Sequence, residues 1–121
     1  MNENSNSKHY DLEDRTYKFA LRCRNFVKRI PRTISNIEYG KQLIRSSGSQ
    51  AANYIEANEA ITKKEFLYRI KLCRKESKES CLWLRLCNVD ENLELILEQN
   101  EAINEAIELR NIFSSIISKS L

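Results

Sequence analysis

Apolar side chains recur every three or four residues along most of this chain, and that spacing predicts long amphipathic helices. The first helix should run from about Leu12 to Ile30, with Asp11 as its N-terminal cap. Pro31 ends it, because the proline ring disfavours a helical residue before it. Its core-facing positions are Leu12, Thr16, Phe19, Ala20, Cys23, Phe26, Val27 and Ile30.

A capping box, in which a hydroxyl residue is followed three positions later by a glutamate, opens the second helix. Ser35 and Glu38 form this box, and the helix should run from about Asn36 to Ala60. Its inner stripe is expected at Ile37, Gly40, Ile44, Ser47, Gly48, Ala51, Tyr54, Ile55 and Asn58. About half of these side chains are small, so a neighbouring helix could approach closely, although tolerated glycines would give the same pattern.

A second box, Thr62 with Glu65, opens a third helix that should run from about Lys63 to Cys87. Its core face is expected at Phe66, Ile70, Cys73, Ser77, Cys81 and Leu84. The three-to-four-residue spacing therefore continues through the middle of the chain.

The last helix follows a break over 88–92 and should run over about 93–118, with residues 99–100 as a potential interruption. Its apolar positions are Ile96, Ile103, Ala106, Ile107, Phe113 and Ile117. Four helices with short links place neighbours antiparallel, which predicts an all-α fold, an antiparallel up-and-down four-helix bundle. This bundle should occupy residues 11–121 as a single domain, with residues 1–10 as a disordered tail.

Composition narrows the classes of function. With two Gly and one Pro in 121 residues, the chain has no loop long enough for an elaborate active site, so no enzyme is expected. His9, the single histidine, lies in the predicted tail, which argues against a metal site and a Ser-His-Asp triad. No cofactor is expected. Cys23, Cys73, Cys81 and Cys87 lack metal spacing and are expected to be reduced core thiols of a cytoplasmic protein. No apolar run reaches the roughly 20 residues of a membrane span, and no signal peptide is expected.

The net charge of +3 hides an asymmetry along the chain. Residues 1–85 carry 18 Lys and Arg against 10 Asp and Glu, which gives +8, and residues 86–121 carry 2 against 7, which gives −5. A basic body favours an anionic partner. Basic and acidic helices packed side by side would produce the same asymmetry.

Two basic stripes follow from the helical geometry. One lies on the first helix, where Lys28 and Arg32 extend it, and the other on the third helix, where Lys64 and Arg85 extend it. The candidate nucleic-acid-binding residues are Arg15, Lys18, Arg22, Arg29, Lys71, Lys75 and Lys78. Solvated faces with pairs within a helix, such as Lys75 with Glu79, are the alternative. Of the aromatic residues, Tyr17 and Tyr68 could stack on bases.

A second polar set joins the second and third helices. Arg45 is expected to bridge Glu56 and a carboxylate of the third helix, an arrangement that is more often architectural than catalytic. Large apolar residues also fall outside the predicted core stripes, which favours self-association. These residues are Leu21, Tyr39, Leu43, Leu82, Trp83 and Leu86.

Several motifs together resemble one family of proteins. The segments are 31–38 (PRTISNIE), 42–49 (QLIRSSGS), 53–60 (NYIEANEA) and 74–80 (RKESKES), followed by Trp83 and Leu84. Over about residues 10–120 the chain resembles the four-helix-bundle family first noticed as reading frames in intervening sequences of bacterial 23S rRNA genes. The accessory variability protein of diversity-generating retroelements is similar.

This resemblance implies an up-and-down bundle that assembles as a ring-like homopentamer without enzymatic activity. The retroelement relatives imply binding to nucleic acid and to a reverse transcriptase through a basic surface. Arg45, Asn53, Glu56, Glu76 and Glu79 match the polar motif positions of the family, and we interpret them as a structural network. The intervening-sequence and retroelement branches both stay open.

Two functions are carried forward from the sequence. The first is a cytoplasmic oligomeric bundle that binds structured RNA or DNA electrostatically, through the seven basic candidates. The second is a protein-interaction scaffold without a nucleic-acid ligand, in which the acidic last helix could itself meet the basic stripes.

Overall fold

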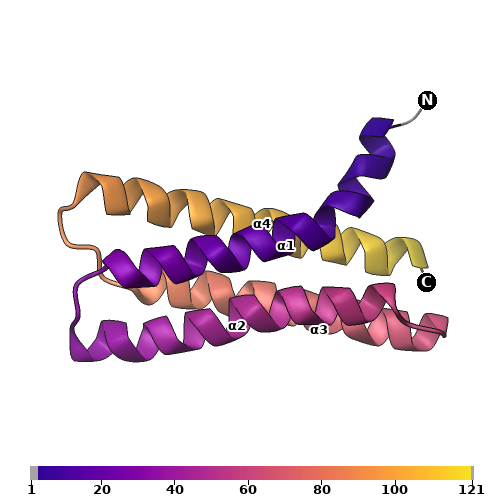
Figure 1. Ribbon diagram of the computed structural model, residues 1–121, viewed down its shortest axis with the longest axis horizontal. Coiled ribbons are helices and arrows are strands. Elements are labelled where there is room, and N and C mark those ends of the chain that lie inside the picture. Colours follow the sequence, from indigo (N-terminus) through magenta and orange to yellow (C-terminus); the bar gives the residue numbers. More distant parts are fainter. Residues whose placement is uncertain (1–2, 121) are drawn as a thin grey trace.

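The protein is an antiparallel up-and-down four-helix bundle (Figure 1). The computed structural model describes the backbone of residues 3–120 and the side chains of residues 12–120. The helices are α1 (Glu3–Arg29), α2 (Ile34–Asn58), α3 (Lys63–Leu86) and α4 (Leu93–Ser120). The all-α fold predicted from the sequence is confirmed.

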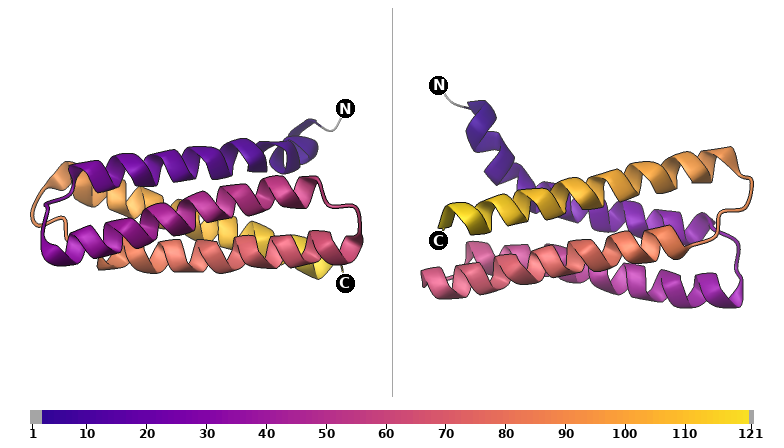
Figure 2. Two further views of the ribbon diagram at one scale, coloured as in Figure 1. Left: turned by 60° about the horizontal axis from the view of Figure 1, so that its bottom comes forward. Right: turned by 180° about the vertical axis from the view of Figure 1, so that it is seen from behind.

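Each helix packs against two neighbours in a closed ring: α1 with α2, α2 with α3, α3 with α4, and α4 with α1. The two further views in Figure 2 show the four helices running side by side along one axis. The core runs the length of this bundle, and its largest apolar side chains are Phe19, Phe26 and Phe113. None of the helices described is long and apolar enough to cross a membrane.

Helix α1 begins earlier than the sequence predicts. Its backbone is helical from Glu3, so the predicted start at Leu12 and the cap at Asp11 are wrong. The predicted tail overlaps these first turns, and residues 1–2 lie outside the described part of the chain. The physical reason is that no Gly or Pro between Glu3 and Leu12 stops the helix. The core face is as predicted, since its eight positions are all buried or half-buried.

Helix α2 starts one residue after Thr33, which replaces the predicted Ser35 as the cap. The Thr33 hydroxyl accepts a hydrogen bond from the Asn36 amide at 3.1 Å, in an extended backbone conformation. Ser35 instead lies within the first turn. Thr33 and Ser35 are two positions apart, and both carry a hydroxyl that can cap a helix. The capping-box pattern with Glu38 favoured Ser35, which is not the cap in the structure.

The inner face of α2 also differs from the prediction. Ile37, Ile44 and Ile55 lie exposed, while Leu43, which was predicted to lie outside the core, is fully buried. The residues that face inwards are Asn36, Gly40, Leu43, Ser46, Ser47, Gln50, Tyr54 and Ala57. Gly40, Ser47 and Tyr54 are therefore buried as predicted. Because much of this face is polar, the hydrophobic pattern misplaced the isoleucines and missed the other inward residues.

Helix α3 is capped as predicted, with one difference. The Thr62 hydroxyl accepts from the Glu65 amide at 3.1 Å, but the Glu65 carboxylate reaches back to the amide of Ile61 at 3.3 Å. The core-facing residues predicted for this helix are buried, apart from Phe66 and Cys81, which are half-buried against the core.

Helix α4 begins at Leu93, as predicted, with the Asn92 side chain accepting from the Leu95 amide at 3.1 Å. It runs without interruption through residues 99–100. Gln99 faces α3 and donates two hydrogen bonds, to the carbonyls of Leu84 at 2.8 Å and Cys87 at 2.9 Å. This side chain therefore satisfies the end of α3 rather than breaking α4.

The two connections at one end of the bundle are joined by Asn36. Its side-chain amide donates to the carbonyls of Pro31 at 2.9 Å and Asn88 at 2.8 Å, and its oxygen accepts from the Asn88 amide at 2.8 Å.

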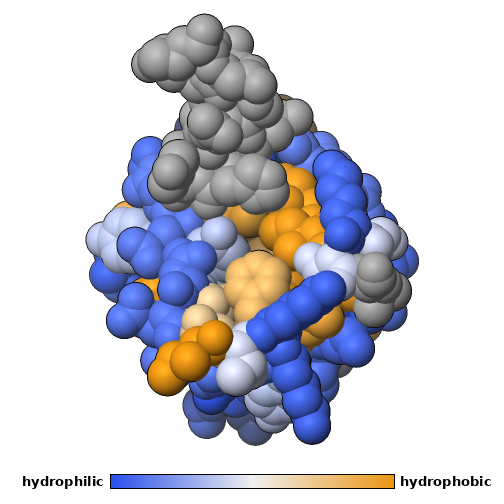
Figure 3. All heavy atoms as spheres, turned by 90° about the vertical axis from the view of Figure 1, so that its right-hand side faces the viewer, coloured by the Kyte–Doolittle hydropathy of each residue, from blue (hydrophilic) through white to orange (hydrophobic). Residues whose placement is uncertain are grey.

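The opposite end of the bundle carries the α2–α3 turn, with Ile61 almost fully exposed. Figure 3 looks onto that end and shows hydrophobic atoms at its centre within a hydrophilic rim.

Candidate nucleic-acid interface

The basic stripe of α1 lies against an acidic stripe of α4. Arg15 donates from Nε and Nη2 to both carboxylate oxygens of Glu105, at 3.1 and 2.7 Å. Further along, Arg22 lies 2.8 Å from Glu98. The remaining pairs are Arg15 with Glu108 at 3.4 Å, Arg22 with Glu101 at 3.3 Å, and Arg29 with Glu94 at 3.2 Å.

These contacts repeat with the spacing of the helices. Arg15, Arg22 and Arg29 are seven residues apart. The glutamates that meet them form two series with the same spacing, so each two turns of α1 face two turns of α4. The series are Glu94, Glu101 and Glu108, and Glu98 and Glu105. The hydrogen bond with Glu105 also raises the pKa of Arg15. The sequence alternative of basic and acidic helices packed side by side is therefore confirmed for this pair. Lys18 pairs along its own helix, with Asp14 at 2.8 Å.

The second basic stripe has a different environment. Lys71, Arg74, Lys75 and Lys78 surround a shallow hollow on the outer face of α3, together with Glu79. None of the four cations forms an ion pair with a described residue. The pair of Lys75 with Glu79, which illustrated the alternative of a solvated face, is absent, and Glu79 pairs with Arg45 of α2 instead. Three of the four were sequence candidates. Arg74 was missed because it lies at the edge of the stripe, towards α4.

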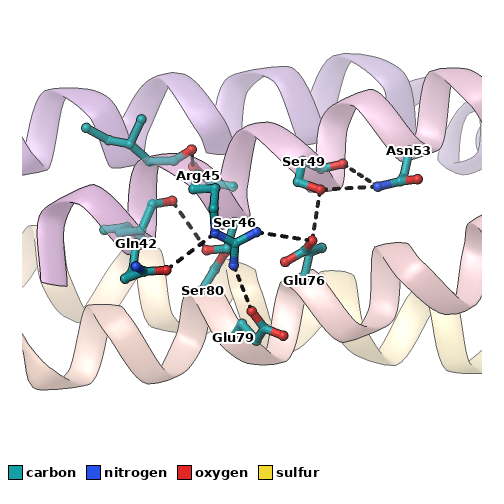
Figure 4. A network of polar contacts seen from close by, with 11 residues as sticks. Gln42, Arg45, Ser46, Ser49, Asn53, Glu76, Glu79 and Ser80 are labelled. Atoms are coloured by element: carbon teal, nitrogen blue, oxygen red, sulfur yellow. Dashed lines mark hydrogen bonds and ion pairs between the residues drawn. The ribbon is translucent and has the colours of Figure 1, made fainter. Parts of the chain in front are cut away.

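A ladder of polar contacts joins α2 to α3 (Figure 4). Arg45 sits between two carboxylates of α3, with Nη2 3.0 Å from Glu79 and Nη1 3.7 Å from Glu76. Gln42 accepts from Arg45 Nε at 3.3 Å, and Ser49 donates to Glu76 at 2.8 Å. The interpretation of Arg45 as a bridge between helices is confirmed.

The ladder continues towards the α2–α3 turn. Asn53 donates to the Ser49 carbonyl at 3.0 Å and accepts from Arg69 Nη1 at 3.0 Å. Glu56, which was predicted to meet Arg45, is exposed and has no polar partner among residues 12–120, so that part of the prediction is wrong. Arg45 pairs with α3 instead, because Glu56 lies eleven residues further along α2, about 16 Å away at 1.5 Å per residue.

Polar groups also occupy the interior between these two helices. Ser46 and Ser80 hydrogen-bond at 2.7 Å, and Gln50 donates to Ser77, which donates in turn to the Cys73 carbonyl at 2.9 Å. The carboxylate of Glu76 is almost fully buried. Buried polar groups that bond each other at fixed positions favour one register between helices. This seam is therefore architectural.

Apolar side chains cover part of the outer surface. Ile37, Ile44 and Ile55 on α2 are about four-tenths to half exposed, as are Leu82 and Leu86 on α3. The two leucines were expected on the outside. Trp83 and Tyr39 were also expected outside the core. Instead, their rings stack against each other between α3 and α2, with 6.1 Å between the ring centroids.

The four cysteines are free thiols, three of them buried. Burial raises the pKa of Cys23 and of Cys73 to about 12 each. Within the described residues, no three His, Cys, Asp or Glu side chains come close enough to hold a metal ion. Cys23 and Cys73 are therefore protonated, unreactive parts of the core at neutral pH.

The fold has a counterpart among solved structures. A protein with unknown function from the S23 ribosomal protein family of Bacteroides thetaiotaomicron superposes with a TM-score of 0.76 at 24% sequence identity. The match covers 92% of this chain and 98% of that one. No protein-family model and no curated protein sequence matches the chain. At this identity the likeness establishes a shared helical-bundle architecture.

Proposed function

We propose that this protein is a non-enzymatic, oligomeric bundle of the cytoplasm that binds RNA or DNA through the outer face of α3. The observation that carries this proposal is a row of cations that form no ion pair with any residue of 12–120, namely Lys71, Arg74, Lys75 and Lys78. Lys and Arg side chains that neutralise phosphates release the counterions condensed on the nucleic acid, and this release is the main source of electrostatic affinity. Cations that are not already held in ion pairs can make such contacts without breaking one.

The paired stripe of α1 takes a different role in this proposal. A phosphate that approached Arg15 or Arg22 would have to displace Glu105 or Glu98, and the displaced carboxylate would repel it. Arg15, Arg22 and Arg29 thus hold α4, and Lys18 is tied to its own helix. The nucleic-acid contacts fall to Lys71, Lys75 and Lys78, with Arg74.

The oligomer in this proposal is a homopentamer, as the family resemblance implies. The likeness to the S23-family bundle supports a common architecture. Exposed isoleucines along α2 provide an apolar surface for contacts between copies, namely Ile37, Ile44 and Ile55. A reverse transcriptase would be a further partner if the chain belongs to the retroelement branch.

Two triple variants with the same loss of charge test the surface. Lys71→Gln, Lys75→Gln and Lys78→Gln together should weaken binding to a labelled RNA hairpin and lower the slope of log affinity against log salt by about two to three. Arg15→Gln, Arg22→Gln and Arg29→Gln together should change that slope by less than one. Fluorescence anisotropy across a salt series measures both. Equal effects of the two variants would contradict the assignment to α3.

The second candidate function is a protein-interaction scaffold. The exposed apolar residues favour it, because Leu82 and Leu86 continue the outer face of α3 directly beyond Lys78. An acidic partner with apolar anchors would fit such a surface. If the unaltered protein fails to bind RNA and DNA at low salt, and retains partners after nuclease treatment, this function replaces the first.

A further inference from the structure

We propose that the ligand of the α3 surface is single-stranded nucleic acid, and that the ring of Tyr68 stacks on one of its bases. This inference rests on the proposed function and adds the class of substrate. Phosphate contacts alone do not distinguish one strand from two, so the argument depends on what lies beside the cations.

Tyr68 belongs to the same face of α3 as the lysines. It lies three, seven and ten residues before Lys71, Lys75 and Lys78, which is the spacing of one side of a helix. Its side chain is 57% exposed although it is one of the largest on the surface. The aromatic ring and the cation row are therefore presented to the same ligand.

The ring is held in place by a neighbouring cation. The guanidinium carbon of Arg69 lies over the Tyr68 ring, 5.6 Å from its centroid. Arg69 is in turn fixed by Asn53 of α2, whose side-chain oxygen accepts from Nη1 at 3.0 Å. Asn53 is itself held by the Ser49 carbonyl and hydroxyl. The polar ladder between α2 and α3 thus orders an exposed aromatic ring, which lowers the entropic cost of stacking.

A stacking surface has a use only for unpaired bases. In a duplex both faces of an internal base are covered by its neighbours, whereas a single strand can turn a base towards an aromatic side chain. The row also suits one strand, because Lys64 and Arg85 extend it along α3 to about 31 Å at 1.5 Å per residue. One flexible backbone can follow such a straight row.

Three probes of similar charge separate stacking from charge attraction: a labelled 15-nucleotide oligothymidine strand, a DNA duplex and inorganic polyphosphate. Tyr68→Ala should weaken binding to the strand about tenfold. Its affinity for duplex and polyphosphate should stay within twofold, and its salt slope should not change. Tyr68→Phe keeps the ring and should bind as the unaltered protein does. Tyr17→Ala removes a similarly exposed tyrosine on α1 and serves as the control.

The outcomes distinguish this inference from the proposed function. If Tyr68→Ala binds the strand as well as the unaltered protein does, while the triple lysine variant binds weakly, nucleic-acid binding stands and the stacking inference is overturned. If Tyr68→Ala loses affinity equally for all three probes, the stacking inference is also overturned, because such a loss indicates a general defect of the variant and not the loss of a stacking contact. If the unaltered protein binds none of the probes, both proposals fail.

Discussion

Asn36 shows how much one polar side chain can contribute inside this bundle. It is buried and makes three hydrogen bonds of 2.8–2.9 Å, to Pro31 and to both backbone groups of Asn88. Replacing it by alanine leaves these groups without their partner, so Asn36→Ala should lower the free energy of unfolding by about 2–3 kcal/mol. Urea denaturation measures the change.

Asn100→Ala is a matched control for that substitution. Asn100 is exposed in the middle of α4, where no described side-chain hydrogen bond involves it, so its removal should change stability by about 0.5 kcal/mol or less. Similar stabilities for the two variants would show that the link between the two connections contributes little.

Substitution of the two glycines of α2 by alanine should change the stability of the protein in opposite directions. A β-carbon at Gly48 would meet no other atom within 4 Å, so Gly48→Ala should stabilise the helix by about 1 kcal/mol. A β-carbon at Gly40 would lie 2.9 Å from a methyl group of Val27, a stiff β-branched side chain. Gly40→Ala should therefore lose the gain seen at Gly48 and destabilise the protein in the same denaturation assay. A stabilising Gly40→Ala would mean that α1 can move away from α2.

The buried thiols predict a loss of stability at alkaline pH. Cys23 and Cys73 have a folded-state pKa of about 12, against 9.0 for a free thiol. Below about pH 9 the thiols are protonated in both states, and their contribution to stability is complete. Between pH 9 and 12 only the unfolded chain ionises, so each thiol lowers the free energy of unfolding by about 1.4 kcal/mol per pH unit.

Urea denaturation at pH 8, 9 and 10 in reducing buffer tests this dependence. The double variant Cys23→Ala with Cys73→Ala should be less stable at pH 8, because it leaves small cavities, but its stability should fall less steeply above pH 9. Identical slopes for the variant and the unaltered protein would show that other groups cause the alkaline loss.

At the scale of the helix, α1 and α4 are joined by charge as much as by apolar packing. Replacing Arg15, Arg22 and Arg29 together by glutamine should lower the free energy of unfolding by about 1–3 kcal/mol, since the Arg15 pair is bidentate and the others are more exposed. The difference should shrink in high salt.

Three other cations near the same ion pairs supply a matched control for the contacts between α1 and α4. Arg24 and Lys28 on α1, and Arg32 in the connection that follows it, form no ion pair with a described residue. Their replacement by glutamine removes an equal charge without touching α4. That variant should unfold within about 0.5 kcal/mol of the unaltered protein. If thermal or urea unfolding shows the two variants to be equally stable, the ion pairs between α1 and α4 do not contribute to stability.

The helices also show what could be predicted from the sequence. The core face of α1 was predicted correctly because its inner residues are apolar at regular spacing. The inner face of α2 was predicted only in part. Gly40, Ser47 and Tyr54 are buried as predicted. Ser46 and Gln50, which bond to α3, were missed, and the isoleucines that were expected inside lie outside. Hydrophobic periodicity cannot identify a face that is buried through polar contacts.

The candidate site was only partly predictable for a similar reason. A stripe of basic residues produces the same sequence pattern whether its side chains face solvent or a row of carboxylates on another helix. Pairing between residues about 65–93 positions apart, as for Arg29 with Glu94 and Arg15 with Glu108, depends on the packing of α1 against α4. The only sign of this pairing in the sequence was the charge asymmetry between the basic residues 1–85 and the acidic residues 86–121.

For the whole molecule, the exposed isoleucines of α2 predict self-association. Ile37→Lys, Ile44→Lys and Ile55→Lys place charges on the surface that should contact another copy. Light scattering should show an assembly for the unaltered protein and a mass near the 14.2 kDa of one chain for the variants, with helical content preserved. Leu97→Lys, an exposed change on α4, should leave the mass unaltered. Assembly that survives all three isoleucine variants would place the contact elsewhere.

The link that Asn36 makes between two connections has a consequence for how the bundle opens. At that end Asn36 ties the α1–α2 link to the α3–α4 link, and Gln99 secures the end of α3. At the other end, the α2–α3 turn is exposed around Ile61. Fraying should therefore start at the α2–α3 turn and travel towards the linked end, and backbone amides there should be the last to exchange with deuterium.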